Sequence, residues 1–135
     1  MIQKYNLSLE DTMKIINTLK AELTQQKRDA AVAVCDAHGE LLAFFRTDGC
    51  KLPSINIAIN KAFTAARERR ESKAIGEDSR TENFPMTNFG DLRYTAWGGG
   101  VPILYQGEII GAVGVSGLPE AEDMLLARQG ASLIG

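Results

Sequence analysis

The sequence predicts an α/β (α+β) domain in which helices cover a five-stranded antiparallel sheet. Segments with the periodicity of amphipathic helices alternate with two pairs of apolar runs. In each pair a short polar segment with glycine joins the two runs, which is the pattern of a β-hairpin and therefore of antiparallel strands. Residues 30–35 are apolar on both faces, so we expect the sheet to be covered on both sides.

The length and composition fit one domain over residues 1–135, with 44% hydrophobic and 24% charged residues. A net charge of −2 gives no basic surface for nucleic acid. No apolar run reaches the about 20 residues that a membrane span needs, and no signal-peptide pattern opens the chain. Cys35 and Cys50 are too few for a disulfide framework. We therefore expect a cytoplasmic protein that contacts neither nucleic acid nor membrane, with Cys35 as a small buried side chain.

The first predicted helix begins after Ser8, which can cap its N-terminus. Asp11, three residues later, completes a pattern like a capping box. Five apolar residues then recur at helical spacing: Leu9, Met13, Ile16, Leu19 and Leu23. Polar residues 24–29 end the pattern, so this segment is expected to be an amphipathic helix that lies on the sheet.

The first predicted hairpin joins strands 30–35 and 41–46 through a turn that contains His38. We expect His38 to occupy an exposed turn position. After a loop over residues 47–53, Ser54 can cap a second helix that runs to about Arg70. The small residues of this helix recur four apart and allow it to approach a sheet or another helix closely; they are Ala58, Ala62 and Ala66.

Residues 74–93 mix turn formers with bulky apolar residues, and we expect them to be irregular. A strand is predicted over residues 93–99, followed by a second hairpin with strands 101–105 and 109–116. Pro119 suits the first turn of a final amphipathic helix, which extends to Ile134. Acidic residues in that turn complement the helix dipole; they are Glu120, Glu122 and Asp123.

Glycines are concentrated in the second hairpin, as WGGGVPI at residues 97–103 and GAVGVSG at residues 111–117. Neither motif is a phosphate cradle. No helix opens after WGGGVPI and no Lys-Ser/Thr pair follows it, and the glycines of GAVGVSG lie within an apolar strand instead of between a strand and a helix. Glycines within strands are typical of a bulge or of a close approach by another backbone. The two strands together predict a trough on the sheet, bordered by Trp97, which a flat ligand or a second subunit could fill.

Few side chains suggest catalysis. One histidine and no Cys-x-x-Cys argue against a zinc site, so no metal is expected. Ser116 lacks the G-x-S-x-G pattern of a nucleophile elbow. Arg46, at the end of a strand, could hold a carboxylate or could brace the turn with Asp48. Asp123 could face the trough, although helix capping explains it equally well.

Taken together, these strings resemble a known family. FFRTDG, INIAINKAFTAA and WGGGVPILYQGEIIGAVGVSG, with the E-x-E-D helix that follows, are similar to the GlcG/HbpS family of small heme-binding or "heme-degrading" domains. That family is in turn similar to the C-terminal domain of PduO-type proteins. The resemblance extends from about Ser8 to Ile134. It implies a profilin-like three-layer α/β/α fold and homo-oligomers from dimers to octamers.

The resemblance also implies a ligand. Members of the family lie in bacterial gene neighbourhoods for glycolate, diol or glycerol use, or act in heme sensing, and some bind heme. The positions of this chain that match the family's motifs are Arg46, Asp48, Lys61, Gly99, Gly100, Pro102, Gly114, Ser116, Gly117 and Asp123. The first predicted helix has no histidine, and its region offers only Tyr5, Thr12 and Met13 as heme ligands.

The leading hypothesis is an oligomeric heme- or small-molecule-binding protein rather than an enzyme. Its expected ligand-binding residues are Arg46, Lys61, Trp97, Gly98, Gly99, Gly100, Ser116 and Gly117. One alternative is an enzyme that acts on a small hydroxy acid or carbonyl compound, with Arg46 as the carboxylate anchor and Asp48 or Asp123 as acid or base. A second alternative is a non-catalytic accessory subunit whose glycines serve assembly.

Overall fold

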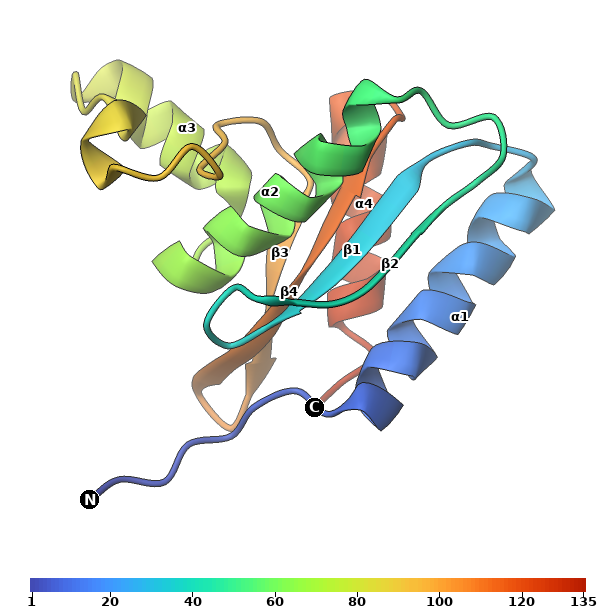
Figure 1. The fold of residues 1–135 in the computed structure, drawn as a ribbon, viewed down its shortest axis with the longest axis horizontal. Helices are drawn as coiled ribbons and strands as arrows, with labels where there is room; N and C mark the ends of the chain where they lie inside the picture. The colour runs from blue at the N-terminus through green and yellow to red at the C-terminus, as the bar shows by residue number, and fades with distance from the viewer.

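Four helices surround one four-stranded antiparallel sheet in the computed structural model, which describes residues 1–135 (Figure 1). The strands are β1 (Ala31–Asp36), β2 (Leu41–Arg46), β3 (Gly100–Tyr105) and β4 (Glu108–Ser116), in the order β2-β1-β4-β3. The helices are α1 (Leu9–Gln26), α2 (Pro53–Glu68), α3 (Ser72–Thr81) and α4 (Glu120–Ala131). None of them is both long enough and apolar enough to cross a membrane. The α+β class and both hairpins are confirmed, but the sheet has four strands instead of five.

The strand predicted over residues 93–99 is absent because its backbone bonds mostly to helices; only the Gly99 carbonyl, at its end, accepts a hydrogen bond from β4, from the Val115 amide at 2.9 Å. The Thr95 amide donates to Thr64 Oγ1 of α2 at 2.9 Å. Ser72 Oγ of α3 donates to the Trp97 carbonyl at 2.7 Å, and the Gly98 amide donates to a Glu120 carboxylate oxygen of α4 at 2.9 Å. This irregular segment therefore connects three helices at one end of the sheet.

Helix α3 begins at Ser72 and takes up the first part of the stretch 74–93 that we expected to be irregular. Its sequence SKAIGEDSRT is mostly polar, and only Ser72, Ile75 and Gly76 are buried. A 3₁₀ turn at Met86–Phe89 follows it. The hydrophobic periodicity that reveals a helix in a sequence is therefore missing here.

The helix termini are partly as expected. Ser8 caps α1, and its hydroxyl accepts a hydrogen bond from the Asp11 amide at 3.1 Å. Ser54 does not cap α2: the helix begins at Pro53, and Ser54 is buried in its first turn. The buried face of α1 is also rotated from the predicted stripe, since Leu9 and Met13 are exposed. The residues that it buries are Thr12, Ile15, Ile16, Leu19 and Leu23.

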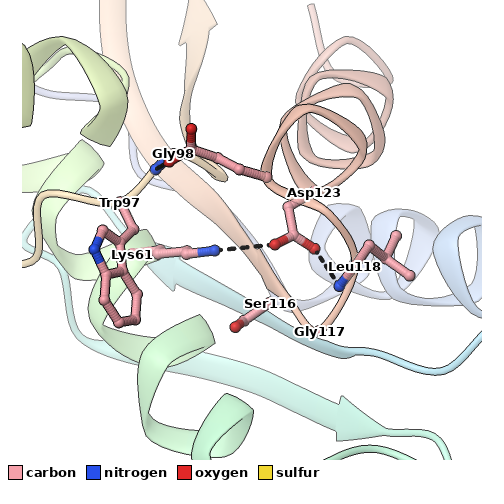
Figure 2. Close-up of a pocket in the computed structure, with 8 residues that line it drawn as sticks. Lys61, Trp97, Gly98, Ser116, Gly117, Leu118 and Asp123 are labelled. Carbon is pink, nitrogen blue, oxygen red and sulfur yellow. Dashed lines mark hydrogen bonds and ion pairs between the residues drawn. The ribbon is translucent and has the colours of Figure 1, made fainter.

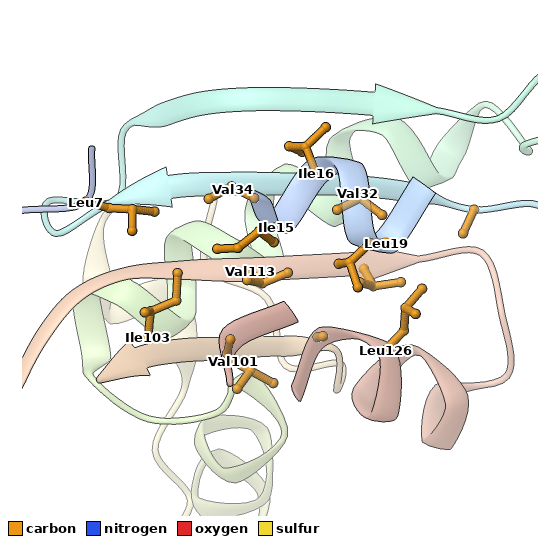
Figure 3. Close-up of a cluster of buried hydrophobic side chains, with 14 of the residues drawn as sticks. Leu7, Ile15, Ile16, Leu19, Val32, Val34, Val101, Ile103, Val113 and Leu126 are labelled. Atoms are coloured by element: carbon orange, nitrogen blue, oxygen red, sulfur yellow. The ribbon is translucent and has the colours of Figure 1, made fainter. Parts of the chain in front are cut away.

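The sheet is covered on both faces, as expected. Helices α1 and α4 pack on one face against large side chains such as Val32, Val113 and Val115 (Figure 3). Helix α2 packs on the other face, where the side chains are small; they include Ala31, Ala33, Cys35, Ala58, Ala62 and Ala112. Cys35 is a small buried side chain, as predicted, and burial raises the pKa of its thiol to about 12.

Paired glycines allow α2 to lie directly on β3 and β4. Gly100 and Gly114 are opposite each other in the two strands. A Cβ atom at Gly100 would collide with the Lys61 carbonyl oxygen, and one at Gly114 with the Ala58 carbonyl oxygen. The surface above these glycines is therefore occupied by the alanine-rich face of α2 from the same chain. The predicted trough is not open to a flat ligand or a second subunit.

Replacing Gly114 with alanine should therefore destabilise the protein strongly. We expect G114A to lower the free energy of unfolding by about 3 kcal/mol, the upper end of overpacking costs, because helix backbone cannot move aside as a side chain can. Urea denaturation followed by circular dichroism measures the loss. G90A is the matched control: its Cβ meets no atom within 4 Å, and only the positive φ of 72° opposes it. Equal losses for the two variants would contradict the close approach of α2.

Candidate functional site

A buried ion pair joins helices α2 and α4 beyond the end of β4. Lys61 Nζ lies 3.2 Å from Asp123 Oδ2 and donates to the Val115 carbonyl at 2.9 Å. The Asp123 Oδ1 atom accepts a hydrogen bond from the Leu118 amide at 2.9 Å. The two side chains are only 3% and 4% exposed. Lys61 extends from the middle of α2, and Asp123 lies in the first turn of α4, where the helix dipole favours an acidic residue.

Burial shifts the proton affinities of this pair in opposite directions. Loss of water lowers the pKa of the Lys61 ammonium, and the charge of Asp123 only partly opposes the change. Loss of water likewise raises the pKa of the Asp123 carboxyl, against the attraction of Lys61. In both cases desolvation is the larger effect. Moving a proton from Lys61 to Asp123 is therefore easier here than between the same groups in water.

A pocket of about 350 Å³ opens above the ion pair (Figure 2). Its walls come from α2, α4, the end of β4 and the segment before β3; they are formed by Lys61, Trp97, Gly98, Ser116, Gly117, Leu118, Glu120 and Asp123. The indole of Trp97 lies at the rim and is 59% exposed. The pocket is thus polar at its floor, with one large aromatic ring at its mouth.

Two groups in the pocket retain unused hydrogen-bonding capacity. Ser116 is 5% exposed and lines the pocket, and its hydroxyl is free to bond to a molecule there, since no side-chain oxygen or nitrogen of the chain is fully buried without a partner. The Lys61 ammonium has three N–H donors, of which two are used by Val115 and Asp123. A polar molecule in the pocket can therefore bond to both Ser116 and Lys61.

The charges around the pocket are compensated in pairs. Glu120 forms an ion pair with Lys73 and accepts the hydrogen bond from the Gly98 amide. The hydrogen bond from Lys73 is the main reason that the pKa of Glu120 is lowered. Lys61 is compensated by Asp123. The lining therefore presents no uncompensated positive charge to attract an anion.

The structure gathers most of the expected binding residues around this pocket, namely Lys61, Trp97, Gly98, Ser116 and Gly117. Asp123, expected to face a trough, lies at the pocket floor. Gly99 and Gly100 do not line it: they lie behind Lys61, where a side chain at Gly99 would strike Val115 and Lys61. Leu118 was not expected in the site, and Glu120 was expected only as a helix-capping residue. Leu118 lies in the turn before α4, and Glu120 is the first residue of that helix, so both line the pocket where α4 begins.

Arg46 and Asp48 lie outside the pocket. Both are exposed, and no ion pair joins them. Arg46 pairs with Ala31 in the register of the sheet, and Ala31 pairs with Ser116 on its other side. Arg46 is therefore in the same row as Ser116 but two strands away, about 10 Å across the sheet. Neither residue lines the pocket above Lys61.

A second hollow of about 510 Å³ lies at the opposite end of the sheet. The segment before α1 runs past the two hairpin turns there: the Ala37 amide donates to Asn6 Oδ1 at 2.8 Å, and the Leu7 amide donates to the Ile110 carbonyl at 3.0 Å. We call this hollow the N-terminal groove; its lining includes Lys4, Tyr5, Ala37, His38, Ala66, Arg69 and Ile109. His38 occupies an exposed turn position, as expected.

Removing the carboxylate of the buried ion pair should be costly. D123N leaves the Lys61 ammonium without its counter-charge, and we expect it to lower the free energy of unfolding by about 3 kcal/mol. Thermal and urea denaturation measure the loss. E122Q is the matched control on the same helix, because it breaks a pair between Arg28 and Glu122 that is partly exposed. We expect a clearly smaller loss for E122Q. A D123N protein as stable as E122Q would show that the pair is not buried as described.

Comparison with known proteins agrees with this fold. Residues 7–132 match the family described as haem degrading protein HbpS-like. Protein GlcG of Escherichia coli (strain K12) is 37% identical over 122 residues, which cover 86% of this chain and 85% of GlcG. A double mutant of HbpS from Streptomyces reticuli superposes with a TM-score of 0.88 at 27% identity, covering 100% of this chain and 91% of that one. A complex of PduOC with heme has a TM-score of 0.87 at 23% identity and 96% coverage of both chains. The chain therefore belongs to the HbpS-like family of haem degrading proteins.

Proposed function

We propose that this protein binds a small uncharged molecule with neighbouring hydroxyl or carbonyl oxygens in the pocket above Lys61 and Asp123. The observation that carries the proposal is the unpartnered Ser116 hydroxyl beside a buried ion pair that has one free N–H. These groups are held by two helices and a strand, so their positions are set before any ligand arrives. Such preorganisation reduces the entropy lost on binding.

The charge balance favours a neutral ligand. Each charge that faces the pocket already has a partner, so a carboxylate or phosphate would enter without a free cation to receive it. A hydroxyl group both donates and accepts hydrogen bonds, and a carbonyl oxygen accepts them. Lys61 and Ser116 can donate to such oxygens, and the carboxylate of Asp123 has further lone pairs that can accept.

The size of the pocket also favours a small ligand. About 350 Å³ is near the lower end of the range for ligand sites, which suits a molecule of a few carbon atoms. The exposed ring of Trp97 can cover its apolar side. The resemblance to the GlcG/HbpS family supports this class of ligand, because diols and glycerol are among the compounds associated with the gene neighbourhoods of the family.

Titration with small molecules tests this proposal, with the fluorescence of the chain's only tryptophan, Trp97, as the signal. Propylene glycol and hydroxyacetone should give saturable changes, and glycolate should bind more weakly. We expect S116A to weaken binding about tenfold, the loss of one hydrogen bond to a buried group. S132A, which removes an exposed hydroxyl from the far end of α4, should bind normally. No saturable change, or S116A binding as tightly as the unaltered protein, would refute the proposal.

Heme is the second candidate ligand, favoured by the family and by the PduOC:heme complex. The pocket above Lys61 does not fit it, since no lining residue there carries an imidazole, a thiol, a thioether or a phenol. The N-terminal groove fits better: His38 and Tyr5 are of the types that hold heme iron. Lys4 and Arg69 could pair with the propionates, and Ala37, Ala66 and Ile109 provide apolar surface. When bound, heme would supply an iron centre for ligand binding or redox chemistry.

Hemin titration followed by the Soret band tests the groove. We expect saturable binding by the unaltered protein and a changed Soret maximum for H38A or Y5F, because each removes one potential iron ligand. The H38A/Y5F double variant should bind at least about tenfold more weakly. S116A, altered at the other end of the sheet, should bind hemin normally. A double variant with unchanged spectrum and affinity would rule out this groove as the heme site.

A further inference from the structure

We infer that Lys61 reacts with an aldehyde or ketone bound in the pocket and forms an imine with it. This inference rests on the proposed function and narrows its ligand to a small hydroxycarbonyl compound. It also assigns a chemical step to a side chain that the fold alone does not require. Lysine is the residue that forms Schiff bases with carbonyl substrates, and burial is one way in which its amine is activated.

Among the seven lysines of the chain, Lys61 alone is buried, and it lines the pocket. Its amine lies at the floor of the open pocket and is itself almost fully shielded from bulk water. Burying a lysine is costly unless the charge is paired, and a leucine or methionine would fill the same space beside the alanines of α2. Reactivity explains why a lysine is placed here.

The neighbours of Lys61 supply what imine formation needs. Asp123 Oδ2, 3.2 Å from Nζ, can accept the proton that the ammonium must lose. Burial lowers the pKa of Lys61 and raises the pKa of Asp123, and both changes favour that transfer. The free Ser116 hydroxyl lines the same pocket and can donate a hydrogen bond to the carbonyl oxygen as negative charge develops on it.

The step is balanced without an oxidant or a reductant. Lys61 gives one proton to Asp123, and its lone pair then attacks the carbonyl carbon while the C=O π electrons move to oxygen. A second proton moves from nitrogen to that oxygen, which gives a carbinolamine. Asp123 returns its proton to the hydroxyl group, which leaves as water while the nitrogen lone pair forms the C=N bond. The product is a positively charged iminium opposite the restored Asp123 carboxylate, so the pair begins and ends with balanced charges and is neutral at the carbinolamine.

Reductive trapping tests the inference on the unaltered protein. Hydroxyacetone and cyanoborohydride convert an imine to a stable secondary amine, and peptide mass spectrometry compares all seven lysines in one sample. We expect Lys61 to be labelled at least about tenfold faster than the exposed Lys51, because the pocket holds the ketone against its amine and the lowered pKa leaves more of that amine neutral. Propylene glycol, which has no carbonyl group, should compete and slow the labelling. In urea the preference for Lys61 should disappear.

The outcomes separate this inference from the proposed function. If hydroxyacetone and propylene glycol both change the Trp97 fluorescence while Lys61 is labelled no faster than Lys51, the imine is excluded and the binding function stands. If neither compound changes the fluorescence and Lys61 is not preferred, both are excluded. D123N gives a further check. It removes the charge that raises the pKa of Lys61, so more of the amine is neutral, but it also removes the acid that returns a proton to the departing hydroxyl group. We expect the second loss to outweigh the first, so labelling of Lys61 should fall about tenfold. Undiminished labelling of Lys61 in folded D123N would show that Asp123 takes no part in imine formation.

Discussion

The contact between α2 and the glycine-bearing strands is the constraint on which the rest of this structure depends. Because Gly100 and Gly114 have no side chains, the helix backbone lies directly on β3 and β4. Only from this short distance does the side chain of Lys61 pass the end of β4, donate to Val115 and reach Asp123 on α4. A helix held farther away by larger residues would leave the lysine short of its partner. The packing of the core therefore sets the geometry of the site.

The ion pair that results is hard to explain by stability. Two charges lose their water at the junction of α2, β4 and α4, and desolvation outweighs their attraction in both pKa shifts. Well-packed apolar side chains at such positions often stabilise a protein as much or more. The same low polarity that makes the pair costly also strengthens its electrostatic effect on a bound molecule. A costly charged pair at the floor of an open pocket is thus more easily understood as part of a binding site.

The sequence predicts those features that depend on local patterns. Both hairpins, the cap at Ser8 and the close approach of α2 follow from periodicity, turn residues and small side chains. Helix α3 could not be predicted, because its polar sequence lacks an apolar stripe. The strand expected over residues 93–99 was wrong because side chains of three distant helices bind that backbone. The pairing of Lys61 with Asp123, 62 residues apart in the sequence, depends on tertiary structure, which local patterns do not reveal. The position of Arg46 away from both residues depends on tertiary structure in the same way.

The same tertiary arrangement keeps the two candidate ligand sites apart. Strand β4 runs from Glu108 at the N-terminal groove to Ser116 at the pocket above Lys61. Nine residues of extended chain span about 27 Å, more than the length of either proposed ligand. A heme in the groove and a hydroxycarbonyl compound in the pocket would therefore not compete for space. Because well-separated sites with no shared partners usually behave additively, we expect the two proposed sites to bind their ligands independently, one at each end of the sheet.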